Sequence, residues 1–196
     1  MLRKLLLSAL VVFATGSPLR ANLVVPTEFR EIVADATLIV RGTVTDVRVV
    51  RAAGRGLDSI ATLAVQTVLK GEADRFVSVR VPGGELGTRR FVMVGAPTFK
   101  VGQHTILFLR RDAEGAWRPV GLAMGVYRVQ AERGSGRPVV APPVVGGWTA
   151  SVSGPIVRGD ARRVTVPVQD FESVIRLIVA GRALPRDVAR SERPVR

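Results

Sequence analysis

Apolar and polar residues alternate along two long stretches on either side of a glycine-containing break, and this pattern predicts a pair of β-strands. The first stretch begins near Leu38, and the second ends near residue 70. A period of two is expected of a strand with one buried face. The break, residues 51–56, is polar and holds two glycines, as suits a hairpin loop. The residues predicted to share one face of the second strand are Ala61, Leu63, Val65, Thr67 and Leu69.

The first of these strands changes phase near Asp46. Up to Val44 the apolar set falls on even-numbered positions, and afterwards it falls on Val47 and Val49. Every later side chain would turn to the wrong face unless one extra residue absorbed this slip. We therefore predict a β-bulge near Thr45 and Asp46, which would bend the strand and let the sheet close into a small barrel.

Shorter alternating segments predict further strands over residues 76–81, 90–94, 104–110, 117–120 and 125–129. The segment 104–110 is apolar on both faces and is expected to lie centrally in the sheet. Val139 and Val140 would pair at an edge, because Pro142 and Pro143 exclude a central strand there. Residues 83–87 and 148–160 are predicted to form loops.

Two segments have helical periodicity instead. A short helix is predicted over residues 26–33, capped by Thr27. A second, amphipathic helix is predicted over residues 168–180, with Glu172 and Arg176 outside its apolar stripe. That stripe consists of Phe171, Val174, Ile175, Ile178 and Val179. The predicted fold class is therefore mainly β: a small OB-like barrel with a short N-terminal helix and a C-terminal amphipathic helix. A β-sandwich is the alternative.

Residues 1–21 have the three-part pattern of a signal peptide. Arg3 and Lys4 precede an apolar run over residues 5–14, and small residues follow at 14–16 and 19–21. The run is too short for a membrane span, which needs about 18 or more apolar residues. We expect an exported protein, periplasmic or secreted, with one domain over residues 22–181 and a basic, disordered tail over residues 182–196.

The net charge of +13 raises the question of an anionic partner. The basic residues are almost all arginines, and they are scattered singly or in pairs rather than clustered. They also lack the interleaved aromatic residues that single-strand binders use. We therefore favour a solvated surface over a binding patch and regard nucleic acid as a disfavoured partner.

Candidate chemistry is sparse in this sequence. There is no cysteine, and the single histidine, His104, has no acidic residue or serine beside it, which favours a structural or surface role. The acidic residues are spread out rather than clustered as in calcium or magnesium sites. No nucleophile elbow, phosphate-binding loop or zinc motif is present. We predict no metal, no cofactor and no enzymatic activity.

The central hairpin carries a further resemblance. Its residues are Ala34-Asp35, Leu38-Ile39-Val40, Gly42-Thr43-Val44 and Val68-Leu69-Lys70-Gly71, with Gly102-Gln103 leading into a later apolar strand. This pattern, over residues 34–111, is similar to the netrin-like modules, which include the tissue inhibitors of metalloproteinases. The resemblance implies an OB-type five-stranded barrel with flanking helices. Inhibitors of that family chelate the protease zinc through an N-terminal cysteine, and this mechanism does not carry over to a chain without cysteine.

Together these patterns predict an exported, non-enzymatic binding module for a protein partner such as a secreted protease. Loops on a rigid barrel commonly carry recognition, so we expect contacts from residues 51–58 and 82–90. The candidate partner-binding residues are Arg51, Arg55, Asp58, Glu85, Arg89 and Arg90. The alternative is binding of an anionic polymer or membrane surface through arginine-rich faces.

Overall fold

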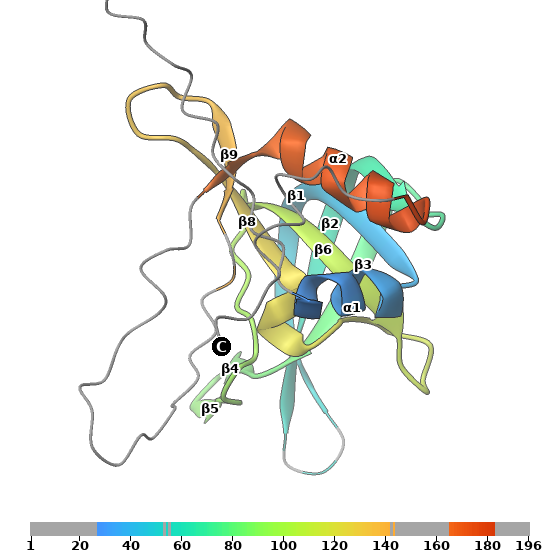
Figure 1. Ribbon diagram of the computed structural model, residues 1–196. Helices are drawn as coiled ribbons and strands as arrows, with labels where there is room; N and C mark the ends of the chain where they lie inside the picture. Colours follow the sequence, from blue (N-terminus) through green and yellow to red (C-terminus); the bar gives the residue numbers. More distant parts are fainter. Residues whose placement is uncertain (1–26, 53, 55, 142, 144–164, 183–196) are drawn as a thin grey trace, which may run out of the picture.

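Five strands pair in a ring in the computed structural model and form a closed β-barrel (Figure 1). In ring order they are β1 (Leu38–Arg51), β2 (Leu57–Lys70), β3 (Phe76–Pro82), β7 (Trp117–Pro119) and β6 (His104–Arg111). The ring closes where β6 pairs with β1, and β3 and β7 run parallel while the other neighbours are antiparallel. The prediction of a small OB-like barrel is confirmed, and the β-sandwich alternative was wrong.

The structure describes residues 27–52, 54, 56–141, 143 and 165–182. Several predictions fall outside this part of the chain: the leader over residues 1–21, the loop over residues 148–160, the candidate residue Arg55, and all of the predicted tail except Arg182.

Further elements are attached to the ring. A sheet extension continues from β6 through β8 (Val126–Ala131), β9 (Pro138–Ala141) and β10 (Val166–Pro167). A separate hairpin consists of β4 (Gly84–Leu86) and β5 (Arg89–Phe91), and a short 3-10 helix, η1 (Leu122–Gly125), precedes β8. Two predictions are corrected here. Residues 83–87 are not simply a loop but contain β4, and the strand predicted over residues 90–94 ends at Phe91, because only β4 offers it backbone partners.

The predicted bulge is present, together with two others that the pattern did not reveal. The pairing of β1 with β2 skips Thr45, as expected, and it also skips Gln66 and Leu69 of β2. Each skipped residue reverses the alternation locally and bends the strand. Leu69 consequently packs on the outside of the barrel, so the prediction that it shares a face with Ala61 and Leu63 was wrong.

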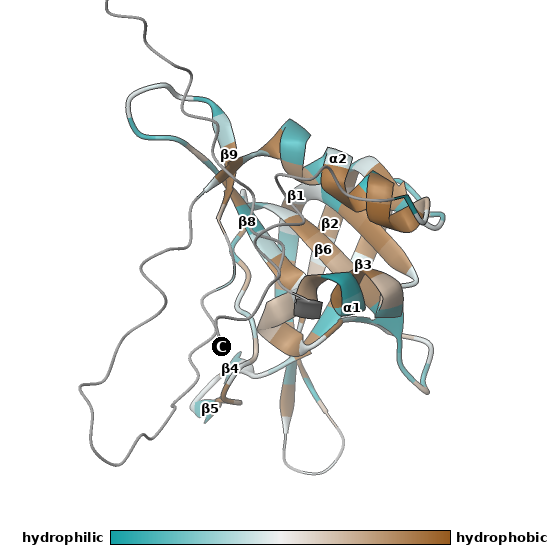
Figure 2. Ribbon diagram, in the orientation of Figure 1, coloured by the Kyte–Doolittle hydropathy of each residue, from teal (hydrophilic) through white to brown (hydrophobic). Residues whose placement is uncertain are grey.

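Two hydrophobic clusters lie on opposite sides of the barrel wall. One fills the barrel and includes Leu107 and Leu109, while the other lies outside it and includes Ile106 and Phe108. Strand β6 is therefore buried on both faces, which explains its continuous apolar sequence and confirms its predicted central position. Figure 2 shows this strand as a mostly apolar ribbon behind the helices.

The outer cluster is covered by α1 (Thr27–Asp35) and α2 (Val168–Val179), which lie over the same side of the barrel (Figure 1). Four aromatic rings join the helices to the wall, with centroids 4.9–5.7 Å apart: Phe29, Phe108, Tyr127 and Phe171. Both predicted helices are confirmed, with two corrections. Val179 was predicted to lie in the apolar stripe of α2, but its side chain is 41% exposed at the end of the helix. Glu172 does not lie outside the buried stripe but is buried, because Arg41 of β1 pairs with its carboxylate at 2.6 Å.

Replacing Ile175 with alanine is expected to lower the free energy of unfolding by about 2–4 kcal/mol. The side chain of Ile175 is fully buried in the outer cluster, and a helix of this length is marginal without such packing. Chemical denaturation followed by circular dichroism measures the effect. A chain ending after Gly181 is the control and should lose almost nothing. Unfolding of the truncated chain, with no effect from Ile175→Ala, would contradict this prediction.

Candidate functional site

Two hairpins meet at one end of the barrel, at the bottom of Figure 1. The backbone N–H of Gly83 donates to the carbonyl of Leu57 at 2.8 Å, and the Ser59 hydroxyl donates to the carbonyl of Gly83 at 2.7 Å. A Cβ on Gly84 would lie 2.8 Å from a methyl carbon of Val49, so a glycine is required for the β4–β5 hairpin to approach β1 this closely. The structure thus brings the two predicted recognition loops, residues 51–58 and 82–90, to the same end.

Four of the six predicted site residues lie exposed at this end. Arg51 ends β1, Glu85 lies on β4, and Arg89 and Arg90 lie on β5. Arg90 donates to Glu85 across the hairpin at 3.0 Å, and both side chains are largely exposed. A surface ion pair of this kind contributes little to stability and leaves both groups available to a partner.

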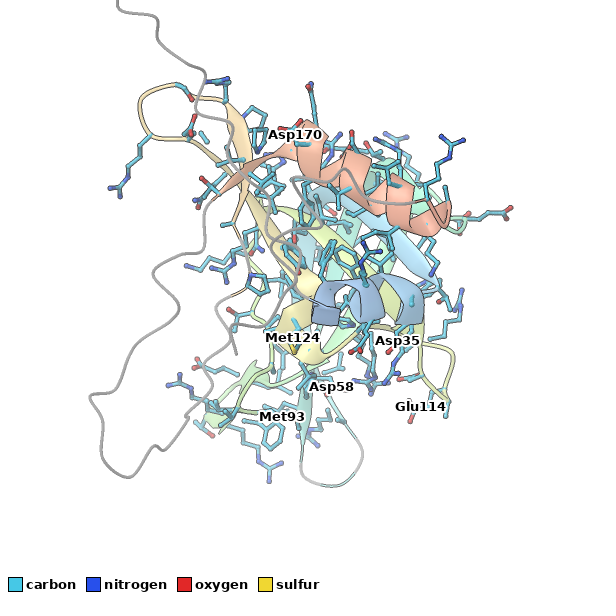
Figure 3. The ribbon with its side chains drawn as sticks, in the orientation of Figure 1. Asp35, Asp58, Met93, Glu114, Met124 and Asp170 are labelled. Carbon is cyan, nitrogen blue, oxygen red and sulfur yellow. The ribbon has the colours of Figure 1, made fainter. Side chains whose placement is uncertain are left out.

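Asp58 does not fit its predicted place in the loop, because it belongs to β2 and its side chain is buried. It lies in an ionic network that consists of Asp58–Arg80 (2.6 Å), Asp58–Arg118 (3.6 Å), Arg80–Glu114 (3.0 Å) and Arg118–Asp112. Figure 3 shows Asp58 and Glu114 at this end of the barrel. The hydrogen bond from Arg118 lowers the pKa of the Asp112 carboxyl below its usual value, and the same bond raises the pKa of Arg118.

This network connects β3 and β7, the two parallel strands of the barrel. Strands β3 and β7 share a single register pair, Val79 with Trp117, and Arg80 and Arg118 are the next residues on these two strands. Two adjacent arginines would repel each other without carboxylates between them. The buried Asp58 is therefore structural, and we remove it from the candidate recognition surface.

An exposed apolar surface lies beside the arginines of β5. We call it the apolar tip, and it consists of Val92, Met93 and Val94, exposed by 67%, 41% and 79%. Isolated exposed apolar residues are ordinary, but three in succession are more informative. The sequence pattern missed this surface because it assigned residues 92–94 to a half-buried strand. Figure 3 labels Met93 and Asp58, both in the lower part of the view.

The apolar tip is held in place by backbone hydrogen bonds. Ala96 N–H donates to the carbonyl of Met93 at 3.2 Å and closes a turn. Ala123 N–H of η1 then donates to the carbonyl of Gly95 at 3.0 Å and fixes this turn to the barrel. Val94 therefore projects from an anchored turn, and Val92 and Met93 lead directly into it, which reduces the entropy that a partner must remove on binding.

Backbone strain occurs next to this anchor. Leu122 has a φ of 56°, and it is the one non-glycine residue with a positive φ in the part of the chain that the structure describes. Its Cδ1 lies 3.9 Å from the position of a Cβ on Gly95. A branched, non-glycine residue rarely adopts this conformation, and such strain is concentrated at functional sites. Two independent features, exposure and strain, therefore mark the same end of the barrel.

His104 lies elsewhere, at the exposed start of β6, with its Nδ1 2.9 Å from the hydroxyl oxygen of Thr43. Within the described ranges, no group of three or more histidine, cysteine or acidic side chains is placed to hold a metal ion. Neither described helix is long and apolar enough to cross a membrane.

Comparison with protein-family models and with curated proteins found no match to this sequence.

Proposed function

We propose that this protein is an exported, non-enzymatic binding module that engages a protein partner, such as a secreted protease, through the apolar tip together with Arg89 and Arg90. The observation that carries the proposal is the run of exposed apolar residues on an anchored turn. Methionine and arginine, together with aromatic residues, are enriched at the buried core of protein interfaces. A rigid barrel that presents loops at one end is a common support for recognition.

Two sequence features support the rest of the proposal. The pattern of residues 1–21 favours export, and the resemblance of residues 34–111 to the netrin-like modules favours a role in protein binding. The inhibitory chemistry of the tissue inhibitors of metalloproteinases is not part of the proposal, because it requires a cysteine. Loss of a hydrolytic activity in His104→Ala, with an unchanged melting temperature, would contradict the non-enzymatic part.

The double variant Val92→Ser/Val94→Ser is expected to weaken partner binding at least about tenfold, because fully burying a valine side chain contributes roughly 1.5 kcal/mol or more and serine loses most of this term. The measurement is saturable binding of the partner captured from periplasmic or culture extract, repeated with the purified partner. The matched control is Val68→Ser/Val179→Ser, which removes two exposed valines on β2 and α2. Equal binding by the tip variant and the wild type would remove the tip from the interface.

Arg51, Arg89 and Arg90 near the tip favour a second candidate function, binding to an anionic polymer or membrane surface. The two functions differ in their dependence on salt. Retention on heparin or on vesicles with anionic lipid should fall steeply between about 0.05 and 0.2 M salt if charge dominates. Binding of a protein partner that persists at the higher salt concentration would favour the first function, and retention that disappears would favour the second.

A further inference from the structure

A hollow of about 330 Å³ lies between the outer face of the barrel and the β8–β9 hairpin. It shares no lining residue with the apolar tip. Its polar side is formed by Arg41, Gln66 and His104 from β1, β2 and β6, and its other side is formed by the hairpin residues Val129, Gln130, Ala131, Gly136 and Pro138. This volume is at the lower end of the range for small-molecule sites.

The polar side of the hollow is organised by a continuous chain of hydrogen bonds. Arg41 donates to Gln66 Oε1 at 3.1 Å, Gln66 donates to the Thr43 hydroxyl oxygen at 3.3 Å, and that oxygen lies 2.9 Å from Nδ1 of His104. The Thr43 hydroxyl retains its proton and can donate it to Nδ1 of His104. In the ring tautomer that accepts this bond, Nε2 carries the ring proton and is a donor; the opposite tautomer reverses both roles.

The bulge in β2 explains how Gln66 takes part in this chain. Arg41 pairs with Thr67 and Gly42 pairs with Val65, so Gln66 is the extra residue between them. A bulge redirects the side chain of the extra residue, and bulges are over-represented next to functional sites. The inward and outward alternation of side chains along β2 therefore changes at Gln66, the residue that links Arg41 to Thr43 and His104 by hydrogen bonds.

Arg41 retains donors for a ligand. A guanidinium has five N–H groups, and Arg41 uses three of them for Glu172 (2.6 Å), Gln66 and Thr67 (2.8 Å). Within the described part of the chain, the other two have no partner. Because Glu172 and Gln66 hold the guanidinium in place, these donors are presented in a fixed orientation.

The charge at the polar side favours a single negative charge. Glu172 pairs with both Arg41 and Arg176, so this group of three side chains carries a net charge of +1. A monoanion matches this charge, whereas a second negative charge would be opposed by the Glu172 carboxylate. The opposite side, with Val129, Ala131 and Pro138, offers apolar contact to the body of the ligand.

We propose that this hollow binds a small monocarboxylate with a short apolar body. The carboxylate lies against the Arg41 guanidinium and Nε2 of His104, and the apolar body packs on the β8–β9 hairpin. Such a ligand is either a free organic acid or the C-terminal residue of a peptide, since both present the same chemistry. This inference goes beyond the proposed function and does not depend on it.

The single histidine makes the test direct, because the His104 ring gives one set of imidazole signals in the ¹H–¹³C NMR spectrum of the full chain. Titration with N-acetyl-L-alanine or with isovalerate should shift these signals in a saturable way. N-acetyl-L-alanine methylamide, which lacks the carboxylate, should not. Tighter binding of N-acetyl-L-alanine would assign a peptide C-terminus, and tighter binding of isovalerate would assign a free acid; either result supports the site.

Three variants locate the binding. Arg41→Lys keeps the charge beside Glu172 but removes the planar fork, and it should weaken binding at least about tenfold. Ala131→Leu should fill the hollow and abolish binding without touching the hydrogen-bonded chain. Arg128→Lys, on β8 but outside the lining, is the matched control and should bind like the wild type. An absent or non-saturable shift, an equal shift with the methylamide, tighter binding of inorganic phosphate, or unchanged affinity in Ala131→Leu would each overturn the proposal.

Discussion

Replacing Arg80 by methionine is expected to lower the free energy of unfolding by about 3–5 kcal/mol, because it leaves the buried carboxylate of Asp58 without its closest partner. Arg80 donates to Asp58 at 2.6 Å, whereas the remaining arginine, Arg118, lies 3.6 Å away. Methionine preserves much of the apolar stem of arginine, so the expected loss comes from the charge rather than from packing. Equilibrium denaturation in urea measures it.

A double variant separates these two causes. Asp58→Leu/Arg80→Met removes both charges, and an apolar pair in place of a buried ion pair is often neutral or stabilising. The double variant should therefore be more stable than Arg80→Met alone. If it is less stable, then the hydrogen-bond geometry where β3 meets β7 matters more than the unpaired charge, and our explanation of the network is wrong.

The sequence was sufficient to predict those parts of the fold in which a local pattern of apolar residues is compatible with only one structure. The phase slip near Asp46 predicted the bulge at Thr45, and the two-sided apolar pattern of residues 104–110 predicted the central position of β6. The bulges at Gln66 and Leu69 escaped prediction for a related reason. Each one reverses the alternation, so the second restores the phase that the first has changed, and the period of two along β2 looks undisturbed.

The candidate site was predicted in part. The segment over residues 82–90 was predicted to carry recognition because it was expected to project as a loop from a rigid barrel, and Glu85, Arg89 and Arg90 lie exposed there. The apolar tip was missed because an apolar run has the same local pattern in a buried strand and in an exposed turn. Its exposure depends on a contact between Gly95 and Ala123, 28 residues apart in the chain.

The burial of two carboxylates, Asp58 and Glu172, was also not predicted, because it too depends on contacts between residues that are far apart in the sequence. Asp58 follows a glycine-rich loop, and Glu172 lies beside an apolar helical stripe, so each was expected to face solvent. Both are buried because an arginine from another element reaches them: Arg80 of the neighbouring strand β3 for Asp58, and Arg41 of β1 for Glu172 of α2. A single sequence does not reveal such partners, since the pairing depends on strand register in the closed barrel.

Replacing Gly42 by alanine is expected to destabilise the barrel by about 3 kcal/mol, the upper end of the usual cost of overpacking. A Cβ at this position would lie 2.2 Å from the carbonyl oxygen of Ala64 and 2.9 Å from Cγ of Leu63. The first contact is with backbone, which has no alternative rotamer, so β1 and β2 must separate. Gly42 pairs with Val65, next to the bulge at Gln66, and this close approach therefore belongs to the geometry that bends the barrel wall.

Gly102→Ala is the matched control for this last prediction. Gly102 has a φ of 82°, and a Cβ there would meet nothing within 4 Å, so the loss should be limited to about 1–2 kcal/mol of backbone strain. Denaturation curves of both variants give the comparison. If Gly42→Ala is no more destabilising than Gly102→Ala, the strands can separate at little cost, and the β1–β2 wall is more compliant than its packing implies.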